Sequence, residues 1–332
     1  MAHRIALVLG ATGGIGGHVA RRLRSGGWTV RALVRDPGKV DGQDGLEWRR
    51  GDAMAASDVA QAAQGASLIV HAVNPPSYRN WGTLVLPMLD NTIAAARANG
   101  ARILLPGTVY NYGPDAFPLL DEASPQNPLT RKGAIRAEME RRLRAAADKG
   151  DARVLILRAG DFFGPQAGNS WFSQGLVKPG RPLRAIQYPG KPGVGHQWAY
   201  LPDVAETMVR LAERETLDAF ATFHMGGHWD GDGTRFIEAI RRAAGNPRLP
   251  VRRIPWFLLG MAAPFVPLCR ELVEMRYLWE TPVRLNNARL TAELGSEPHT
   301  PLDAAVHATL VHLGCLPEGQ GRAAASPAPM NR

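Results

Sequence analysis

A short apolar run near the start of the chain leads directly into a glycine-rich turn. Residues 5–9 read as a β-strand, glycines follow at positions 10, 13 and 16, and a helix is expected from residue 18. Glycine lets the backbone turn sharply and approach a pyrophosphate, and the free N–H groups at the start of the next helix hold that anion. The strand before and the helix after this G-x-x-G-x-x-G pattern predict a dinucleotide-binding loop. The alternative is a glycine-rich turn without a ligand.

The end of the second predicted strand, residues 28–34, bears on the choice of dinucleotide. Arg35 stands there, where an acidic residue binds the ribose of NAD or an arginine accommodates the 2′-phosphate of NADP. Arg35 therefore favours NADP(H), with NAD possible because Asp36 follows at once. The alternative is that Arg35 is a solvated turn residue.

The composition suits a sizeable α/β protein and argues against a membrane protein. The 332 residues fit one large domain or two smaller ones, and a hydrophobic fraction of 45% can build a core. The chain lacks the run of about 18 apolar residues that a membrane span needs. The most hydrophobic stretch, residues 256–269, contains two prolines, so we expect a core helix or the wall of an apolar pocket, and no membrane partner.

Cysteine content and charge narrow the expected surroundings and partners. Cys269 and Cys315 give no disulfide framework or metal-ligand set, and the first residues do not resemble a signal peptide, so we expect a cytoplasmic protein without a metal. The net charge of +9 comes from arginines spread along the chain, without a nucleic-acid-binding signature. We therefore expect an anionic cofactor and a small-molecule substrate rather than nucleic acid, in a monomer or a homodimer.

Strands and helices alternate through the first half of the chain, which predicts an α/β fold with a Rossmann-type, doubly wound parallel sheet. Further strands are expected at residues 46–50, 67–73, 101–105, 153–157 and 222–226. A short helix is expected to start at residues 57–59 with Ser57 as N-cap, and longer helices are expected at 83–99, 132–149, 234–244 and 302–313. Residues 161–200, rich in glycine, proline and aromatics, look like loop. We expect a cofactor domain at 1–160, a smaller substrate-binding region at 161–316 that partly returns to it, and a disordered tail at 317–332.

Taken in order, the motifs resemble the short-chain dehydrogenase/reductase superfamily, most of all its extended and atypical branches, which include epimerase/dehydratase relatives and NmrA-like proteins. The segments that carry the resemblance are residues 10–16, 30–35, 51–52, 109–113, 158–165 and 199–205. The resemblance implies a pyrophosphate surrounded by Gly10, Thr12, Gly13, Ile15 and Gly16. It further places Arg35 at the adenosine ribose, Asp52 beside the adenine, Ala72, Val73 and Asn74 under the ribose, and Gly107 with Thr108 near the nicotinamide. Alternatively, Asp52 caps a strand and Asn74 makes a turn.

The resemblance also implies a catalytic pair that this sequence lacks. Redox members of the family use a tyrosine and a lysine four residues later, but no lysine stands four residues after any of the six tyrosines. Counted back from Glu138, the two positions hold Thr130 and Ala134. An unactivated threonine hydroxyl has far too high a pKa to replace the tyrosine, so the usual mechanism is in doubt.

Other side chains are candidates for the missing chemistry. Lys132 is the first candidate, because a dehydrated lysine can lose several pKa units and act as an acid or base; the alternative is a solvated lysine beside Arg131. Tyr112 is the second candidate, and Thr108 could bind a substrate carbonyl. On the substrate side we expect Tyr78, Arg79 and Trp81 in a proline-stiffened loop, together with His196, although His196 could equally be structural.

Two functions remain open on this sequence. The first is an NADP(H)-dependent oxidoreductase or epimerase/dehydratase with a non-standard proton donor. The second is a redox-inactive, NmrA-like sensor that binds NAD(P) and a partner. The missing Tyr/Lys pair favours the sensor, whereas the aromatic residues of the second half favour an enzyme with an enclosed pocket.

Overall fold

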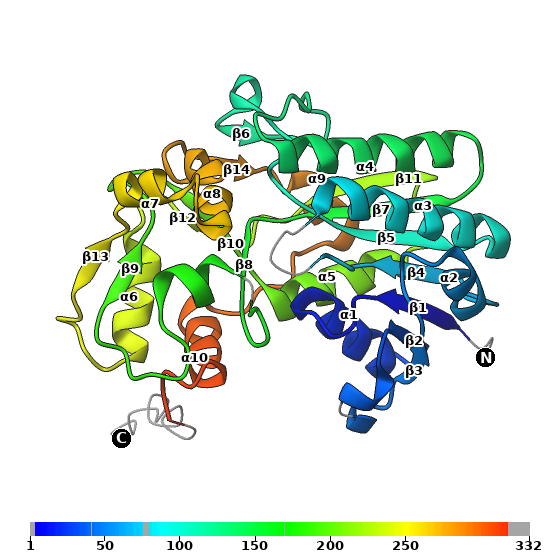
Figure 1. Cartoon of the computed structure of the whole chain (residues 1–332), viewed down its shortest axis with the longest axis horizontal. Helices are drawn as coiled ribbons and strands as arrows, with labels where there is room; N and C mark the ends of the chain where they lie inside the picture. Colours follow the sequence, from blue (N-terminus) through cyan, green and yellow to red (C-terminus); the bar gives the residue numbers. More distant parts are fainter. Residues whose placement is uncertain (1–3, 41, 76–79, 169, 318–332) are drawn as a thin grey trace, which may run out of the picture.

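The computed structural model, which describes residues 4–40, 42–75, 80–168 and 170–317, is built around a seven-stranded parallel sheet (Figure 1). The strand order is β11-β7-β5-β4-β1-β2-β3. The strands are β1 (Ile5–Leu9), β2 (Thr29–Val34), β3 (Glu47–Arg50), β4 (Leu68–His71), β5 (Arg102–Gly107), β7 (Arg153–Arg158) and β11 (Phe220–His224). This order confirms the expected Rossmann-type fold, with the topological switch between β1 and β4.

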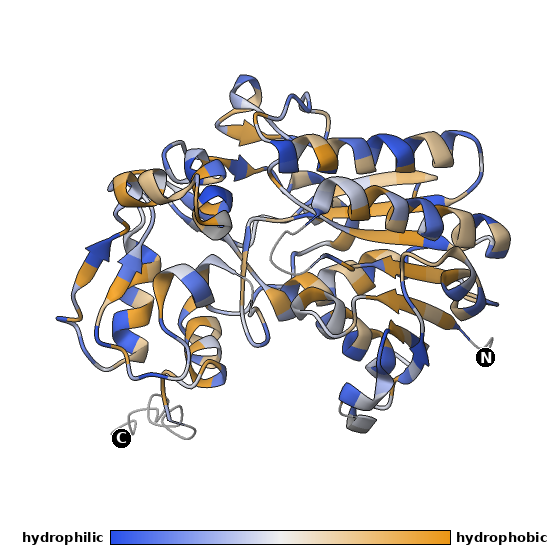
Figure 2. Ribbon diagram, viewed as in Figure 1, coloured by the Kyte–Doolittle hydropathy of each residue, from blue (hydrophilic) through white to orange (hydrophobic). Residues whose placement is uncertain are grey.

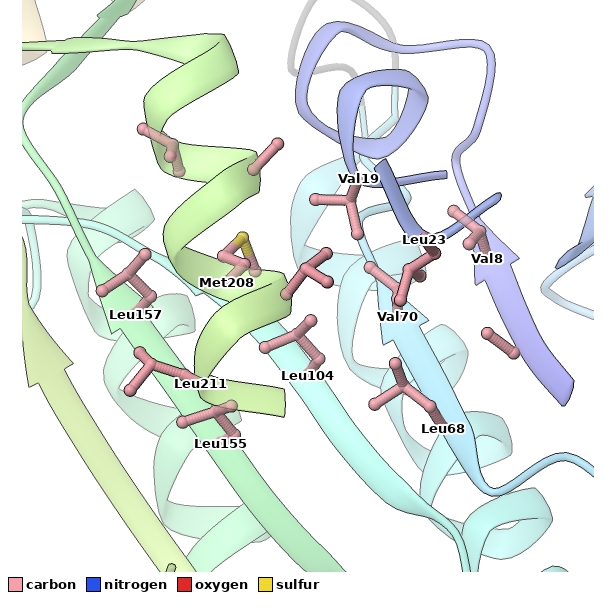
Figure 3. Close-up of a cluster of buried hydrophobic side chains, with 14 of the residues drawn as sticks. Val8, Val19, Leu23, Leu68, Val70, Leu104, Leu155, Leu157, Met208 and Leu211 are labelled. Carbon is pink, nitrogen blue, oxygen red and sulfur yellow. The ribbon is translucent and has the colours of Figure 1, made fainter. Parts of the chain in front are cut away.

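Helices cover both faces of the sheet, as continuously apolar parallel strands require. One face carries α1 (Gly14–Ser25) and α5 (Leu201–Ala212), and the other carries α2 (Ala56–Ala62), α3 (Trp81–Asn99) and α4 (Arg131–Asp148). Figure 3 shows Val19 and Leu23 of α1 and Met208 and Leu211 of α5 over the strands. On α4, the predicted apolar stripe of Ile135, Met139 and Leu143 is buried against the sheet.

Most elements of the first half lie where the sequence predicts them. The first strand has the predicted bounds, and α3 ends at Gly100, whose φ of +62° suits glycine. The prediction of Ser57 as an N-cap was wrong. Ser57 lies inside α2, because the preceding turn is closed by Asp58 instead: its Oδ2 accepts from the N–H of Asp52 at 2.9 Å.

The second half is more regular than the sequence suggested. Residues 161–200 were expected to be loop, but they include short strands that pair with segments distant in sequence. Besides α5 and β11, the second half of the chain contains β8 (Asp161–Phe163), η5 (Phe172–Leu176), β9 (Ile186–Tyr188), β10 (His196–Tyr200), β12 (His228–Asp230), α6 (Thr234–Ala243), β13 (Val251–Arg253), α7 (Trp256–Ala262), α8 (Pro267–Glu274), η6 (Arg276–Trp279), α9 (Ala288–Leu294) and α10 (Leu302–His312). Two minor strands, β6 (Leu119–Leu120) and β14 (Arg284–Leu285), pair with each other, and 3-10 turns lie at Pro37–Lys39, Gly42–Asp44 and Pro114–Ala116.

A second core, rich in aromatic residues, holds this half together. Phe163, Phe172, Trp198 and Phe236 are fully buried against one another, with ring centroids 4.4–6.3 Å apart. Both α5 and β11 leave this region and pack on the main sheet, so the chain crosses between the two parts more than once.

The most hydrophobic stretch of the sequence, residues 256–269, is expected to be a core helix or the wall of an apolar pocket, and the prediction of a core helix was wrong. Within α7 no residue is buried, and Phe257 and Leu258 are exposed. The sequence signal misled because hydrophobicity alone does not say whether another element covers a helix. Among the described residues, no helix is long and apolar enough to cross a membrane.

Candidate functional site

The glycine-rich turn lies at the carboxyl edge of the sheet, between the end of β1 and the start of α1, beside β4. Gly10 has a φ of +92°, and a Cβ there would lie 2.5 Å from the carbonyl oxygen of Ala72. A Cβ at Gly16 would overlap the carbonyl oxygen of Gly10. Packing within the protein therefore requires glycine at both positions, with or without a ligand. Ala72 is the small residue against which the turn packs.

Gly13 is different, because protein packing does not demand a glycine there. It is exposed, has an ordinary φ of −88°, and its Cβ would approach only the Gly10 oxygen, at 3.3 Å. It is the N-cap of α1 and makes no side-chain capping bond, while Thr12 beside it is exposed and Ile15 packs on the core. Open space therefore lies over the start of the helix, where free N–H groups suit a pyrophosphate.

A segment after β8 lies against the same helix, a contact that the sequence did not suggest. A Cβ at Gly14 would meet the Gln166 carbonyl oxygen at 2.9 Å. The His18 ring donates to the Pro165 carbonyl at 2.9 Å, and Arg21 donates to the Gln166 side chain. The start of α1, the predicted pyrophosphate site, is thus bordered by residues from the second half of the chain.

At the end of β2, Arg35 is exposed. Of its two charged neighbours, Asp36 has hydrogen-bond and ion-pair partners, whereas Arg50 has no ion-pair partner among the described residues. Asp36 accepts from the N–H of Gly38 at 3.2 Å and pairs with Lys39, so its carboxylate closes the local turn. On the neighbouring strand, Arg50 is also exposed, and its register partner is Val34. Within the described part of the chain neither Arg35 nor Arg50 has an ion-pair partner, and the sequence did not suggest Arg50.

The remaining predicted cofactor residues follow the carboxyl ends of β3, β4 and β5. Asp52 accepts from the N–H of Met54 at 3.0 Å, a turn-closing role. Val73 packs on the core and Asn74 is exposed. Gly107 is needed by the sheet itself, since a Cβ there would lie 2.5 Å from Cγ of Arg158.

The substrate-side loop is described only in part. Tyr78 and Arg79 lie outside the described residues. Trp81 opens α3 with 1% exposure, and the Arg136 guanidinium lies 5.2 Å from its ring centroid. This burial gives Trp81 a packing role and leaves it no surface for a ligand.

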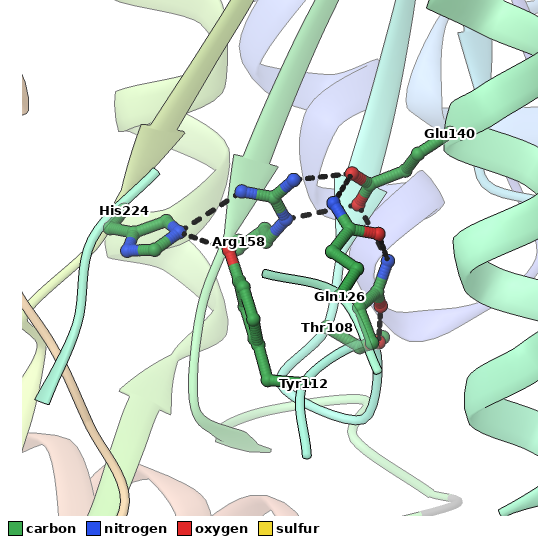
Figure 4. A network of polar contacts seen from close by, with 7 residues as sticks. Thr108, Tyr112, Gln126, Glu140, Arg158 and His224 are labelled. Carbon is green, nitrogen blue, oxygen red and sulfur yellow. Dashed lines mark hydrogen bonds and ion pairs between the residues drawn. The ribbon is translucent and has the colours of Figure 1, made fainter. Parts of the chain in front are cut away.

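A buried polar network lies against the middle of α4, at Glu140 (Figure 4). Arg158 of β7 pairs with Glu140 of α4, and Asn111 donates to the same carboxylate at 3.0 Å. Thr108 donates to Asn111 at 2.9 Å. Thr108, the predicted carbonyl-binding residue, is thereby oriented by a chain of bonds that ends on a buried ion pair.

Tyr112, the second predicted proton donor, is fully buried in this network. Its hydroxyl lies 3.0 Å from His224 Nε2, which also accepts from Arg158, while His224 Nδ1 donates to the Leu120 carbonyl at 3.0 Å. Burial, with the Arg158 charge, lowers the pKa of His224 to about 3, and burial raises that of Tyr112 above its ordinary value. Tyr112 therefore has a packing role, with its proton held by a neutral histidine.

Lys132, the first predicted candidate, is not a solvated lysine. Its side chain is 4% exposed in the first turn of α4, with Nζ 2.6 Å from Glu271 and 3.6 Å from Glu274. Nζ also donates to the Glu271 carbonyl at 3.2 Å. A cavity of about 390 Å³, lined by Arg131, Arg270, Glu271 and Glu274, adjoins this cluster.

The contacts of α4 also bear on its register. Thr130 is the N-cap, accepting from the N–H of Gly133, and Glu138 pairs with Arg141 and Arg142 near the surface. The buried glutamate of the helix is Glu140. Counted back from Glu140 instead of Glu138, the same spacing of eight and four residues leads to Lys132 and Arg136.

His196 lies in the second half, in contact with groups that approach the Lys132 cluster. Its ring donates to Asp161 at 2.7 Å and stacks on Trp279 at 3.7 Å. Burial raises the pKa of Tyr277, as do the charges of Glu274, from the Lys132 cluster, and of Asp161, the partner of His196. The buried Tyr277 hydroxyl has no hydrogen-bond partner among the described residues, a feature without any sequence signal.

Comparisons with known proteins identify what this chain is similar to. A model described as the NAD dependent epimerase/dehydratase family matches residues 6–226. A 3-diazoavenalumate denitrifying reductase of a Streptomyces species is 32% identical over 178 residues. That match covers 49% of this chain and 57% of the relative, so the chain spans little more than half the length of this curated relative.

Solved structures share the fold over nearly the whole chain. A UDP-glucose 4-epimerase of Thermotoga maritima, solved with UDP-glucose, has a TM-score of 0.71 at 16% identity. A UDP-glucose 4-epimerase of Thermus thermophilus, in complex with NAD, has a TM-score of 0.70 at 19% identity. Each likeness covers 93% of this chain and 98% of the other, which extends the shared architecture into the second half.

Proposed function

Because the chain belongs to the NAD-dependent epimerase/dehydratase family, we propose that it is an NADP(H)-dependent reductase of a small molecule. The observation that carries this proposal is Lys132, buried in the first turn of α4 between two carboxylates. Since α4 follows β5 and runs antiparallel to the strands, this turn lies at the carboxyl edge of the sheet, where ligands of such folds bind.

The residues at the sheet edge fit a phosphorylated dinucleotide. The open start of α1 over Gly13 takes the pyrophosphate, and Arg35 with Arg50 takes the 2′-phosphate of NADP(H). Asp36 does not compete for the ribose, because its carboxylate is engaged with Gly38 and Lys39. When bound, the reduced nicotinamide supplies a hydride.

In the place of the missing tyrosine, Lys132 donates a proton to the substrate or stabilises negative charge on it. The spacing from the buried Glu140 supports this assignment, because it puts Lys132 at the tyrosine position and Arg136 at the lysine position. Glu271 and Glu274 hold the ammonium group in one place, and Thr108 orients the substrate. A group so placed can protonate an oxygen or stabilise its negative charge as hydride adds to carbon.

The absent tyrosine also bears on the substrate class. The Streptomyces relative is named as a reductase of a diazo compound. A diazonium carbon can accept a hydride and lose dinitrogen without any proton from the protein, so such a substrate needs no tyrosine. Carbonyl compounds need a proton donor, and Lys132 would then supply it.

A redox-inactive sensor is the second candidate. It is supported by the engagement of Lys132 with both glutamates, which occupies the one candidate donor in α4. A protein that only senses the bound cofactor would need no free acid or base. An epimerase or dehydratase of UDP-sugars is a third possibility, suggested by the named activities of the structural neighbours.

The test is a substrate panel with the purified chain and NADPH, followed by the absorbance of the reduced nicotinamide. The panel contains aryl diazo compounds, aldehydes and ketones, and UDP-sugars, the last also assayed by product analysis. We expect NADPH oxidation with the first or second class, lost in Lys132→Met for carbonyl substrates. Tight NADPH binding without turnover of any class would favour the sensor and contradict the reductase.

A further inference from the structure

One outer surface of the second region combines exposed hydrophobic side chains with arginines. We call it the α7 face; its residues are Arg248, Arg252, Arg253, Phe257, Leu258, Met261, Phe265, Val266 and Arg270. All are exposed. In Figures 1 and 2 the mainly hydrophobic α7 lies on the same outer edge as the more hydrophilic β13. The reductase proposal uses none of these side chains.

The helix α7 packs beside α8, and its Trp256 anchors it on the second core. Trp256 is half-buried, donates from Nε1 to the Pro189 carbonyl at 2.9 Å, and packs edge-to-face on Trp171. This anchor turns the next residues outward: Phe257 is 75% exposed and Phe265 is 85% exposed. Phe257 and Met261 are four residues apart and therefore share one side of α7, and Phe265 is exposed in the turn that follows the helix.

The charge around this apolar surface has one sign. Residues 247–270 contain four arginines and no aspartate or glutamate. No described acidic residue forms an ion pair with Arg248, Arg252, Arg253 or Arg270, and the next acidic residues, Glu271 and Glu274, are engaged by Lys132. The face is therefore both cationic and hydrophobic.

This combination selects among occupants. A second copy of the chain, seated symmetrically on the same face, would bring arginines against arginines. Exposed aromatic and aliphatic side chains flanked by arginines instead match the headgroup and acyl boundary of a bilayer that carries negative lipids. We propose that the α7 face docks on the surface of an anionic lipid bilayer, with Phe257 and Phe265 inserted and the four arginines at the lipid phosphates.

Docking would leave the rest of the chain in water, since the only described hydrophobic helix involved, α7, is seven residues long. The next helix, α8, carries Glu271 and Glu274, so the bilayer contact would lie beside the Lys132 cluster. The inference departs from the expectation, drawn from sequence hydrophobicity, that the chain has no membrane partner. It does not depend on the proposed reductase activity.

The test is co-sedimentation of the full chain with phosphatidylcholine vesicles, with and without phosphatidylserine. We expect binding to be at least about tenfold stronger when phosphatidylserine is present, and to weaken as salt screens the arginines. Phe257→Ser with Phe265→Ser should reduce binding to the anionic vesicles at least about tenfold, because the inserted area is lost. Arg252→Gln with Arg253→Gln should reduce it to a smaller extent.

Leu119→Ser is the matched control, because Leu119 is 50% exposed on β6, outside the α7 face. Its binding should equal that of the unchanged chain. Equal binding to both vesicle types, no binding to either, or binding unaffected by the phenylalanine substitutions would overturn the proposal. So would a dimer in sedimentation velocity that dissociates in the phenylalanine variant, since the face would then be a self-association surface.

Discussion

Two regions at the carboxyl edge of the sheet reach their geometry in different ways. The glycine-rich turn proposed as the phosphate loop, residues 10–16, is shaped by its glycines and by Ala72, the residue after β4. The first turn of α4 is shaped by α8, because Lys132 bonds to Glu271 and Glu274. These partners lie 139 and 142 positions later in the chain. A site built from local backbone geometry can be recognised in a sequence, whereas a site built from distant side chains cannot.

The largest expected effect tests the loop. Gly13→Val should abolish NADP(H) binding, because the side chain fills the space over the start of α1, while the fold persists because Gly13 has ordinary backbone angles. Calorimetry with NADPH and thermal unfolding measure the two properties. Gly16→Ala is the contrast: its Cβ meets the Gly10 carbonyl, so it should lower the unfolding temperature. Unchanged NADPH affinity in Gly13→Val would remove the distinction between the two glycines.

The next effect tests the α4 turn. Lys132→Met should lower turnover of a carbonyl substrate about 10²–10⁴-fold, the usual contribution of a positioned acid or base, with NADPH affinity nearly unchanged. Lys149→Met, at the exposed far end of the same helix, should have no effect. The single variant leaves the Glu271 and Glu274 carboxylates without their partner. A triple variant, Lys132→Met with Glu271→Gln and Glu274→Gln, is therefore measured beside it. Full turnover in both would exclude Lys132 from catalysis.

Arg35 sharpens the comparison from the cofactor side. A charge-assisted hydrogen bond to phosphate contributes about 1.5–3 kcal/mol, so Arg35→Ala should lower the preference for NADPH over NADH about tenfold to a hundredfold. Arg50→Ala should have an effect in the same direction, because Arg50 lies on the neighbouring strand. Arg49→Ala is the control, since Arg49 pairs with Glu47. Equal affinity of the unchanged protein for both cofactors would refute the assignment.

The smallest expected effect is on the pH dependence of stability, and it compares one buried histidine near each region. Burial lowers the pKa of His71, at the end of β4, and of His224, beneath α4, to about 3. Below the ordinary pKa of 6.5 the unfolded chain takes up protons that the folded chain refuses, so stability falls as pH falls. The slope is at most about 1.4 kcal/mol per pH unit for each histidine.

Urea unfolding between pH 7 and pH 5 measures this slope. His71→Asn and His224→Asn should each make the dependence shallower, whereas His307→Asn, at a partly exposed position, should not. A slope that survives both substitutions would mean that other groups dominate the acid sensitivity of the fold.

Much of the fold was predictable because it depends on short-range patterns. Apolar runs such as Ile5–Leu9 mark buried strands, and the stripe of Ile135, Met139 and Leu143 marks the inner face of a helix. The second half was harder, since its strands are only two to five residues long and pair across long separations, as β8 does with β10. Such strands have too few residues to show a period.

The sequence by itself determined the Rossmann-type fold, the place of the glycine-rich turn, and the absence of a tyrosine followed four residues later by a lysine, because each is a matter of residue type at fixed spacing. Only the tertiary structure decided which glutamate of α4 is buried, which carboxylates hold Lys132, and that α7 is uncovered. Burial and pairing depend on which distant segment arrives at a surface, and no spacing within a single segment encodes that.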